Sequence, residues 1–245
     1  MQQWMHTKPT LLAVFAHPDD ETFRPGGTLM LLARSGVQVQ VLTATRGEAG
    51  SRGDPPLCTS EELAAVREKE LHCACAVLGL QPPRLMDYPD GSLAEVDFSE
   101  LLANILAVIE ATQPQVMLSF GLDGLSAHPD HIAIGRASRE AYHQVDDIAA
   151  LYTVAIPLSV AQRLNMRQVR PVPDVEIDLS VDVTPVWETK LAAIRCHATQ
   201  LGVTPLLRAP EEQQRLFFGQ EYFVKAAERR PEHNFLYEAL KEFLL

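Results

Sequence analysis

Short runs of apolar residues, rich in leucine and β-branched side chains, recur along the first two thirds of the chain. Three of these runs predict buried strands, because they show no alternation between polar and apolar positions: 10–16, 37–45 and 115–120. Two more strands are predicted at 85–88 and 150–156. Apolar side chains at three- and four-residue spacing over 98–109 predict an amphipathic helix between two of these strands.

Further helices are predicted between the other strands. Ser60 and Gly79 flank a helical segment over 61–78 as N-cap and C-cap, and another helical pattern begins at His128. Strands that alternate with helices predict parallel βαβ units with helices on both faces of one sheet. We therefore expect an α/β fold, a Rossmann-like domain with a mostly parallel sheet flanked by helices.

The last third of the chain is less regular. Three segments in it carry a pattern, first of a strand and then of two helices: 175–179, 184–199 and 211–245. No low-complexity linker or internal repeat divides the sequence. The whole chain, 1–245, is therefore predicted to be a single domain, with its core over 1–145 and an irregular C-terminal part over 146–245.

Composition and charge narrow the class of protein. Hydrophobic residues make up 47% and charged residues 22% of the 245 residues, which is typical of a globular protein and excludes a fibre or a disordered chain. The net charge of -11 argues against a basic nucleic-acid-binding surface. No apolar run is long enough to cross a membrane, and residues 1–10 lack the pattern of a signal peptide.

Four cysteines occur at positions 58, 73, 75 and 196. None forms a Cys-x-x-Cys pair, so their spacing indicates neither a metal site nor a redox site. Unpatterned cysteines in a chain of this length are typical of a reducing compartment. We therefore expect a cytoplasmic protein.

The densest polar cluster follows the first predicted strand directly and reads Ala-His-Pro-Asp-Asp-Glu over 16–21. Ligands of open α/β sheets bind outside the carboxyl ends of the strands. Three acids and an imidazole beside a buried strand are costly unless a cation such as a divalent metal compensates them. The alternative is a polar turn that caps a helix through Asp20 or Glu21.

A second cluster, His-Pro-Asp-His over 128–131, follows the predicted strand 115–120 and opens a helix. Its position is again the carboxyl end of a strand, and His128 and His131 lie one helical turn apart. A single histidine is usually a surface or core residue. Two His-Pro-Asp segments at the same end of one sheet favour a shared site instead.

Imidazole and carboxylate are ligands that zinc prefers, and a catalytic zinc site leaves one position open for water. The two clusters supply two histidines and one aspartate, and a further acid remains to take a proton from water that the metal activates. A spare histidine could stabilise or protonate the reaction centre. Ferrous iron is an alternative metal, because it also suits two histidines and one carboxylate.

These segments resemble those of the LmbE/PIG-L family, whose members are metal-dependent deacetylases of N-acetylglucosamine-containing small molecules. Further matching motifs follow in the same order: Gly-Gly-Thr at 26–28, Thr-Arg-Gly-Glu at 45–48, Arg-x-x-Glu-Leu at 67–71 and Tyr-Pro-Asp-Gly at 88–91. The resemblance covers 1–145, and the C-terminal third matches only loosely. It implies a small-molecule substrate, an N-acetylated amino sugar or a conjugate of one.

The resemblance also implies roles for individual residues. One divalent metal, zinc, would be bound by three side chains: His17, Asp20 and His131. Asp19 would be the general base that acts on the metal-bound water. His128 would stabilise the oxyanion or protonate the leaving amine, with Asp130 orienting its ring. Glu21 would be a hydrogen-bonding support rather than a ligand.

Three other polar residues have competing interpretations. Arg67 falls within the apolar arc of the predicted helix 61–78, so it needs a partner, either Glu70 or, as the resemblance suggests, the hydroxyls of a substrate. Asp90 stands in a Pro-Asp-Gly turn and is either a turn residue or a contact to a substrate hydroxyl. His197 lies at the edge of an apolar helix face, which favours a core-edge role over a functional one.

The leading hypothesis is a zinc-dependent N-deacetylase that removes acetate from an N-acetylglucosamine-containing small molecule. The alternatives are a metal-dependent hydrolase of another amide or of an ester, and a non-catalytic module that binds a sugar or metabolite. The presence of both Asp19 and His128 favours catalysis, because a binding module needs no acid beside the metal-bound water. Assembly into a homo-oligomer is left open.

Overall fold

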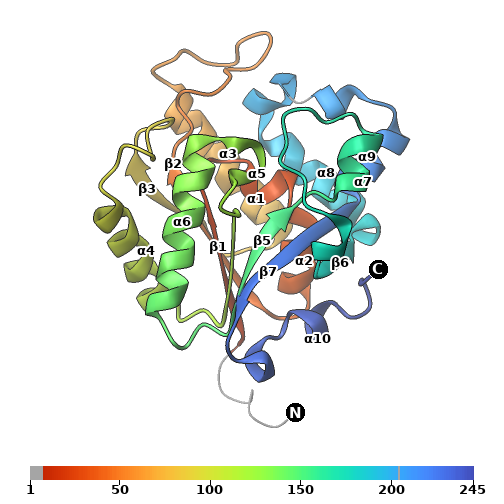
Figure 1. Cartoon of the computed structure of the whole chain (residues 1–245). Coiled ribbons are helices and arrows are strands. Elements are labelled where there is room, and N and C mark those ends of the chain that lie inside the picture. The colour runs from red at the N-terminus through yellow and green to blue at the C-terminus, as the bar shows by residue number, and fades with distance from the viewer. Residues whose placement is uncertain (1–7, 204) are drawn as a thin grey trace.

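The computed structural model describes residues 8–203 and 205–245. The expectation about a signal peptide concerns the start of the chain, and residues 1–7 lie outside the described part. One seven-stranded sheet runs through the molecule in the order β3-β2-β1-β4-β5-β7-β6 (Figure 1). The strands span Thr10–Phe15 (β1), Gln38–Thr45 (β2), Arg84–Tyr88 (β3), Val116–Ser119 (β4), Ala150–Ala155 (β5), Leu179–Asp182 (β6) and Gln220–Glu228 (β7).

Strands β1 to β5 pair in parallel, whereas β7 pairs antiparallel with both β5 and β6. Every residue of β1, β4 and β5 is buried, as expected for parallel strands that are covered on both faces. The predicted α/β class with a mostly parallel sheet is therefore confirmed.

Helices cover both faces of the sheet (Figure 1). On one face lie α4 (Phe98–Thr112) and α6 (Pro129–Gln144), which pack on each other. On the other lie α2 (Gly26–Arg34), α3 (Leu63–Leu78) and α8 (Trp187–Cys196). None of the helices in the described residues is both long and apolar enough to cross a membrane.

Shorter elements join these layers. The short α-helices are α1 (Asp20–Phe23), α5 (Gly124–Ala127), α7 (Leu158–Arg163), α9 (Glu211–Phe218) and α10 (Leu236–Leu240). The 3-10 turns are η1 (Asp174–Glu176), η2 (Thr184–Val186), η3 (Ala198–Val203), η4 (Pro205–Arg208) and η5 (Pro231–His233).

Two predictions for the C-terminal part are wrong. The segment 175–179 is not a strand over its length, because Val175 lies in a 3-10 turn with 94% of its surface exposed and β6 begins only at Leu179. The tail is not uniformly helical, because β7 separates α9 from α10. Ser60 does not cap α3, which starts at Leu63, but Gly79 does end it in the left-handed conformation, with φ of 73°.

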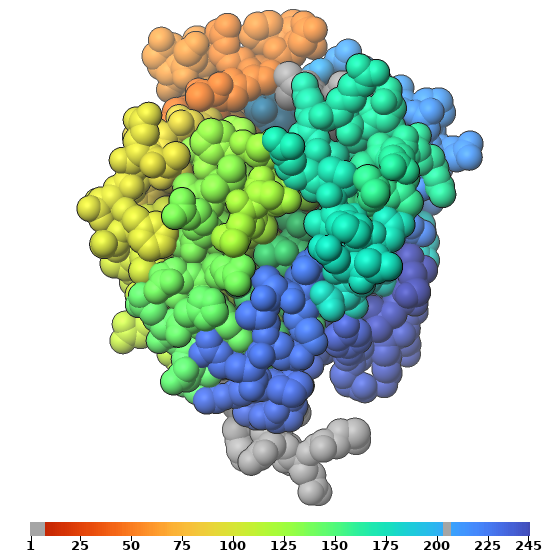
Figure 2. All heavy atoms as spheres, viewed as in Figure 1, coloured from red at the N-terminus to blue at the C-terminus, as the bar shows by residue number. Residues whose placement is uncertain are grey.

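The strand order reverses direction at β1. The chain leaves β1 for β2 on one side and reaches β4 on the other, so the connections diverge at β1. Crevices at such a reversal, outside the carboxyl ends of the strands, are where open α/β sheets bind ligands. Both polar clusters follow the two strands that flank this point, β1 and β4. The segment between β2 and α3 forms a ridge at this end of the molecule (Figure 2, orange).

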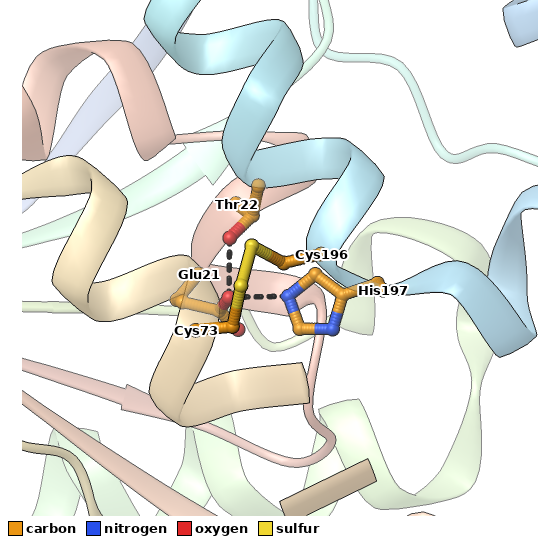
Figure 3. The surroundings of a disulfide bond; sticks show 5 residues. All are labelled: Glu21, Thr22, Cys73, Cys196 and His197. Carbon is orange, nitrogen blue, oxygen red and sulfur yellow. Dashed lines mark hydrogen bonds and ion pairs between the residues drawn. A yellow bond between two sulfur atoms is a disulfide. The ribbon is translucent and has the colours of Figure 1, made fainter. Parts of the chain in front are cut away.

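A disulfide joins Cys73 of α3 to Cys196 of α8 (Figure 3). Cys58 and Cys75 are free. The two partners are 123 residues apart in sequence, and the packing of α3 against α8 brings them together. Local cysteine spacing therefore could not indicate the bond.

Breaking this disulfide is expected to destabilise the protein. A cross-link restricts the unfolded chain, and a disulfide typically contributes about 2–4 kcal/mol to the free energy of unfolding. Cys73→Ser is expected to lose that amount in urea unfolding, and reduction of the wild type with a dithiol should reproduce the loss. The control is Cys58→Ser, which removes a free thiol. Equal unfolding midpoints for Cys73→Ser and wild type would contradict a stabilising role.

Candidate metal and catalytic site

The two polar clusters lie side by side at the carboxyl ends of β1 and β4. After Phe15 the chain turns, and the amide of Asp20 donates to the carbonyl of His17 over 3.3 Å. After β4 the chain passes through α5 and enters α6, whose first residue is Pro129. The structure brings the clusters together, with His17 Nδ1 lying 3.1 Å from His131 Nε2.

Ligand atoms of the three side chains predicted to bind the metal converge here. Asp20 Oδ1 lies 3.4 Å from His131 Nε2, and Asp20 Oδ2 lies 3.7 Å from His17 Nδ1. Two atoms bound to one tetrahedral zinc at 2.0–2.1 Å lie about 3.3 Å apart. The observed spacings of 3.1, 3.4 and 3.7 Å therefore fit one metal ion held by these three side chains.

The outer nitrogens of both histidines are occupied by acceptors. His131 Nδ1 lies 3.1 Å from the carbonyl of Gly124, which can only accept, so the lone pair of His131 is on Nε2. His17 Nε2 lies 3.0 Å from Asp90 Oδ1 and 3.1 Å from Asp130 Oδ2, so its proton faces these carboxylates. The nitrogens left to bind a metal are those that face each other and Asp20.

Two other groups of side chains have ligand atoms within 4.8 Å of one another: His17 with His128 and His131, and His17 with Asp90 and Asp130. In the second group both carboxylates contact His17 Nε2, the nitrogen that already donates to them. The tautomers therefore favour the set of His17, Asp20 and His131.

The surroundings shift the pKa values of the two histidines in opposite directions. Burial lowers the pKa of His17, but hydrogen bonds to Asp130 and Asp90 outweigh it and raise the pKa to about 10. Burial, together with the charge of His17, lowers the pKa of His131 to about 4. His131 is therefore neutral at neutral pH, whereas His17 is protonated and would release a proton on binding a metal.

The carboxylate of Asp130 contacts His17 rather than His128, so the expected orienting of the His128 ring by this side chain is not seen. Its carboxylate accepts from the backbone N–H groups of Gly91 and Leu93, at 2.8 and 3.0 Å, and contacts His17 Nε2. Burial would raise the pKa of Asp130, but these hydrogen bonds keep it below its ordinary value. Asp130 therefore holds the ring of His17, because the turn after β3 reaches across to α6.

His128 is held by the backbone instead. It is the N-cap of α6, and its Nδ1 accepts from the backbone N–H of Asp130 over 3.2 Å. The proton of the neutral ring is therefore on Nε2. Burial and the charges of His17 and His131 lower the pKa of His128. Its ring centre lies 4.9 Å from the rings of both His17 and His131, so a donor stands beside the candidate metal ligands.

Asp19 combines a strained backbone with a partly exposed carboxylate. Its φ is 118°, in the left-handed region, where a residue other than glycine costs on the order of 1–3 kcal/mol. Burial raises the pKa of the carboxyl to about 6, although the charge of Arg67 opposes the rise. Asp19 Oδ2 lies 3.1 Å from Arg67 Nη2, and 22% of the side-chain surface remains exposed. The Asp19 carboxylate is therefore fixed by Arg67 and still reachable from solvent.

Arg67 is buried, with 3% of its surface exposed. Besides Asp19 it donates to the carbonyls of Gly47, over 2.7 Å, and Pro18. Gly47 has φ of 69°, and a Cβ there would lie 2.0 Å from Arg67 Nη1, so this contact requires glycine. The alternative pair with Glu70 is not formed. The predicted contact between Arg67 and substrate gains no support from this geometry.

Two acidic residues near Arg67 have other partners. Glu70 accepts hydrogen bonds from the backbone N–H and the hydroxyl of Thr199, at 2.8 and 2.7 Å. Asp90 Oδ2 accepts from the amide of Ala49 over 2.9 Å, while its Oδ1 contacts His17. Asp90 therefore ties the loop after β2 to the site, and its contact with a substrate hydroxyl stays a prediction.

A buried pair of residues behind Asp19 was missed by sequence reasoning. His197 is fully buried, and its Nε2 lies 2.8 Å from Glu21 Oε1. Burial would raise the pKa of Glu21, but the charge of His197 keeps it low, and Glu21 in turn raises the pKa of His197. Glu21 Oε2 accepts from the backbone N–H of Asp19, which confirms its predicted supporting role. No local sequence signal joins two residues so far apart.

A model of the family described as "PIG-L: GlcNAc-PI de-N-acetylase" matches residues 12–142. A 1D-myo-inositol 2-acetamido-2-deoxy-alpha-D-glucopyranoside deacetylase of Acidothermus cellulolyticus is 31% identical over 258 residues, covering 88% of each chain. A probable N-acetyl-alpha-D-glucosaminyl L-malate deacetylase 2 of Bacillus anthracis is 32% identical over 213 residues, covering 85% of this chain and 89% of that protein.

The fold is also found among solved structures. The N,N'-diacetylchitobiose deacetylase of Pyrococcus horikoshii superposes with a TM-score of 0.64 at 23% identity, covering 91% of this chain and 85% of that one. At this level of identity the similarity concerns the fold alone.

Proposed function

We propose that this chain, which belongs to the PIG-L (LmbE-like) family, is a metal-dependent N-deacetylase that releases acetate from a small molecule containing N-acetylglucosamine. The observation that carries the proposal is that the side chains of His17, Asp20 and His131 converge beside Asp19. The Asp19 side chain is held in place by Arg67 and is not needed as a metal ligand. A site built only to bind a sugar needs no such acid.

The metal is proposed to be zinc, held by His17 Nδ1, His131 Nε2 and the Asp20 carboxylate, with ferrous iron as the alternative that the same donors suit. When bound, such an ion supplies a Lewis acid that polarises the acetyl carbonyl and lowers the pKa of water. Asp90 and Asp130 hold the His17 ring from behind, which fixes the nitrogen that binds the metal.

The protein's own residues then transfer the protons and stabilise the charge that develops during the reaction. Asp19 takes a proton from the attacking water as oxygen bonds to the acetyl carbon. His128 donates its Nε2 proton in a hydrogen bond to the carbonyl oxygen, which becomes negative as the amide is attacked. When the carbon–nitrogen bond breaks, Asp19 returns its proton to the amine. The products are acetic acid and a free amino sugar; the acid ionises to acetate, its proton passes to the amine through solvent, and Asp19 ends ionised as it began.

The names of the relatives support a conjugate of N-acetylglucosamine with a small polar group as the substrate class. A cytoplasmic location is proposed from the sequence only. The disulfide between Cys73 and Cys196 is an observation against a strongly reducing compartment.

The test is a screen for acetate release by zinc-loaded protein. Substrates should include the N-acetylglucosaminyl conjugates of inositol and of malate, N,N'-diacetylchitobiose, an N-acetylated peptide and an acetyl ester. We expect acetate and one equivalent of free amine from the sugar conjugates, and none after a chelator removes the metal. Cleavage of the ester alone would point to another hydrolase, and tight binding without acetate release would contradict a catalytic function.

A further inference from the structure

A buried ion pair lies directly behind the candidate general base. Glu21, in α1, and His197, which follows the last residue of α8, have no exposed side-chain surface (Figure 3). His197 Nδ1 has no hydrogen-bond partner among the described residues, so the ring is fixed through its Nε2 contact with Glu21. Burying an ionised pair carries a desolvation penalty that apolar side chains would avoid. Packing alone therefore does not explain why these two charged side chains are buried here.

The second oxygen of Glu21 connects this pair to the active site. Glu21 Oε2 accepts a hydrogen bond from the backbone N–H of Asp19 over 2.9 Å. That backbone is in the left-handed conformation, with φ of 118°, which an aspartate rarely adopts unless its surroundings enforce it. A buried carboxylate that is itself fixed by His197 is well suited to enforce it.

Asp19 is thus held from two sides by two different helices. Arg67 of α3 binds its carboxylate, and Glu21, backed by His197 at the end of α8, binds its backbone. The disulfide joins α3 to α8 through Cys196, the residue immediately before His197. The disulfide therefore links the helix that carries Arg67 to the end of the helix that precedes His197.

We propose that His197 is a positioning residue of the deacetylase reaction, which acts through Glu21 to hold Asp19 in its strained conformation. The inference rests on the proposed function. Without His197, Glu21 keeps a buried charge and loses its ion-pair partner, while the hydroxyl of Thr22 still donates to it. The Asp19 backbone is then free to relax, and its carboxylate moves. A displacement of about 1 Å at a catalytic group can lower the rate by about a hundredfold.

The test compares two replacements of His197 in zinc-loaded protein, with the N-acetylglucosamine conjugate that the wild type deacetylates fastest. His197→Leu removes the donor and is expected to lower kcat by about ten- to a hundredfold, with KM and bound zinc unchanged. His197→Gln keeps an N–H donor at a similar reach and is expected to recover most of that rate. If His197→Leu does not fold, Glu21→Gln is the substitute, with an expected fall in kcat at unchanged zinc content.

A double-mutant cycle separates positioning from a general loss of structure. If His197 acts through Asp19, then adding His197→Leu to Asp19→Asn should lower the residual rate less than twofold. The matched control is Lys190→Met with Glu221→Gln, which replaces another buried ion pair, 2.6 Å long, between α8 and β7. It is expected to lower the melting temperature and leave kcat unchanged.

The outcomes distinguish this inference from the proposed function. A wild-type protein without acetate release would contradict the proposed function itself. An active wild type with an equally active, folded His197→Leu would overturn only the role of His197. The same would follow if His197→Leu lost its zinc, or if it slowed Asp19→Asn as strongly as it slows the wild type.

Discussion

Asp19→Asn is expected to keep its metal and lose about a hundred- to ten-thousandfold in kcat. The amide preserves the shape of the side chain, but it cannot take a proton from water. Arg67 Nη2 can still contact the amide oxygen, so the position of the side chain should change little. The measurement is acetate release per bound metal ion, with metal content determined by elemental analysis of the same samples.

A matched control is Asp146→Asn, because that aspartate is 91% exposed and pairs only with Arg229 at the surface. Exposed ion pairs contribute little to stability, so this variant should behave like the wild type. If metal-loaded Asp19→Asn turns over substrate at a near-normal rate, then Asp19 is not the residue that accepts the proton from water.

Replacing His131 and His128 is expected to give two different defects, although both are imidazoles in the first turn of α6. His131→Ala should lose the metal and with it all activity, because Nε2 of His131 is one of the three converging ligand atoms. His128→Ala should keep the metal and lose about a hundred- to a thousandfold in kcat, as expected when one donor to a developing oxyanion is removed.

Two further variants sharpen this comparison. Asp130→Asn should weaken metal binding by about ten- to a hundredfold, because its carboxylate holds the His17 ring and not that of His128. His143→Ala, on the exposed side of the same helix, is the control and should change neither quantity. If His128→Ala loses the metal and His131→Ala keeps it, then His128 is the metal ligand and His131 is the donor to the oxyanion.

The fold and the position of the site could be predicted because both follow from local patterns. Strands that are buried on both faces read as continuous apolar runs, so β1, β2 and β4 were placed to within a residue or so of their observed ends. The two His-Pro-Asp segments follow β1 and β4, and neighbouring parallel strands bring their carboxyl ends together. The prediction of a helical C-terminal tail failed because β7 is only half-buried and follows directly on α9.

The contacts that tune the site could not be predicted, because they join segments that are distant in sequence. Asp130 lies one residue from His131 and two from His128, yet its carboxylate turns to His17 because the backbone after β3 supplies its donors. Arg67 was expected to pair with its helical neighbour Glu70 or with substrate. The partner of a buried charged side chain depends on the loop that packs over it. The spacing of apolar residues along the helix gives no information about that loop.

Titration of metal-free protein with zinc, while acetate release from an N-acetylglucosamine conjugate is followed, tests the central claim most directly. One set of ligands, His17, Asp20 and His131, predicts that activity rises in proportion to added zinc and stops rising at one equivalent per chain. Full activity in the metal-free protein, or no acetate release at any zinc concentration that the protein binds, would contradict a single catalytic metal at the ends of β1 and β4.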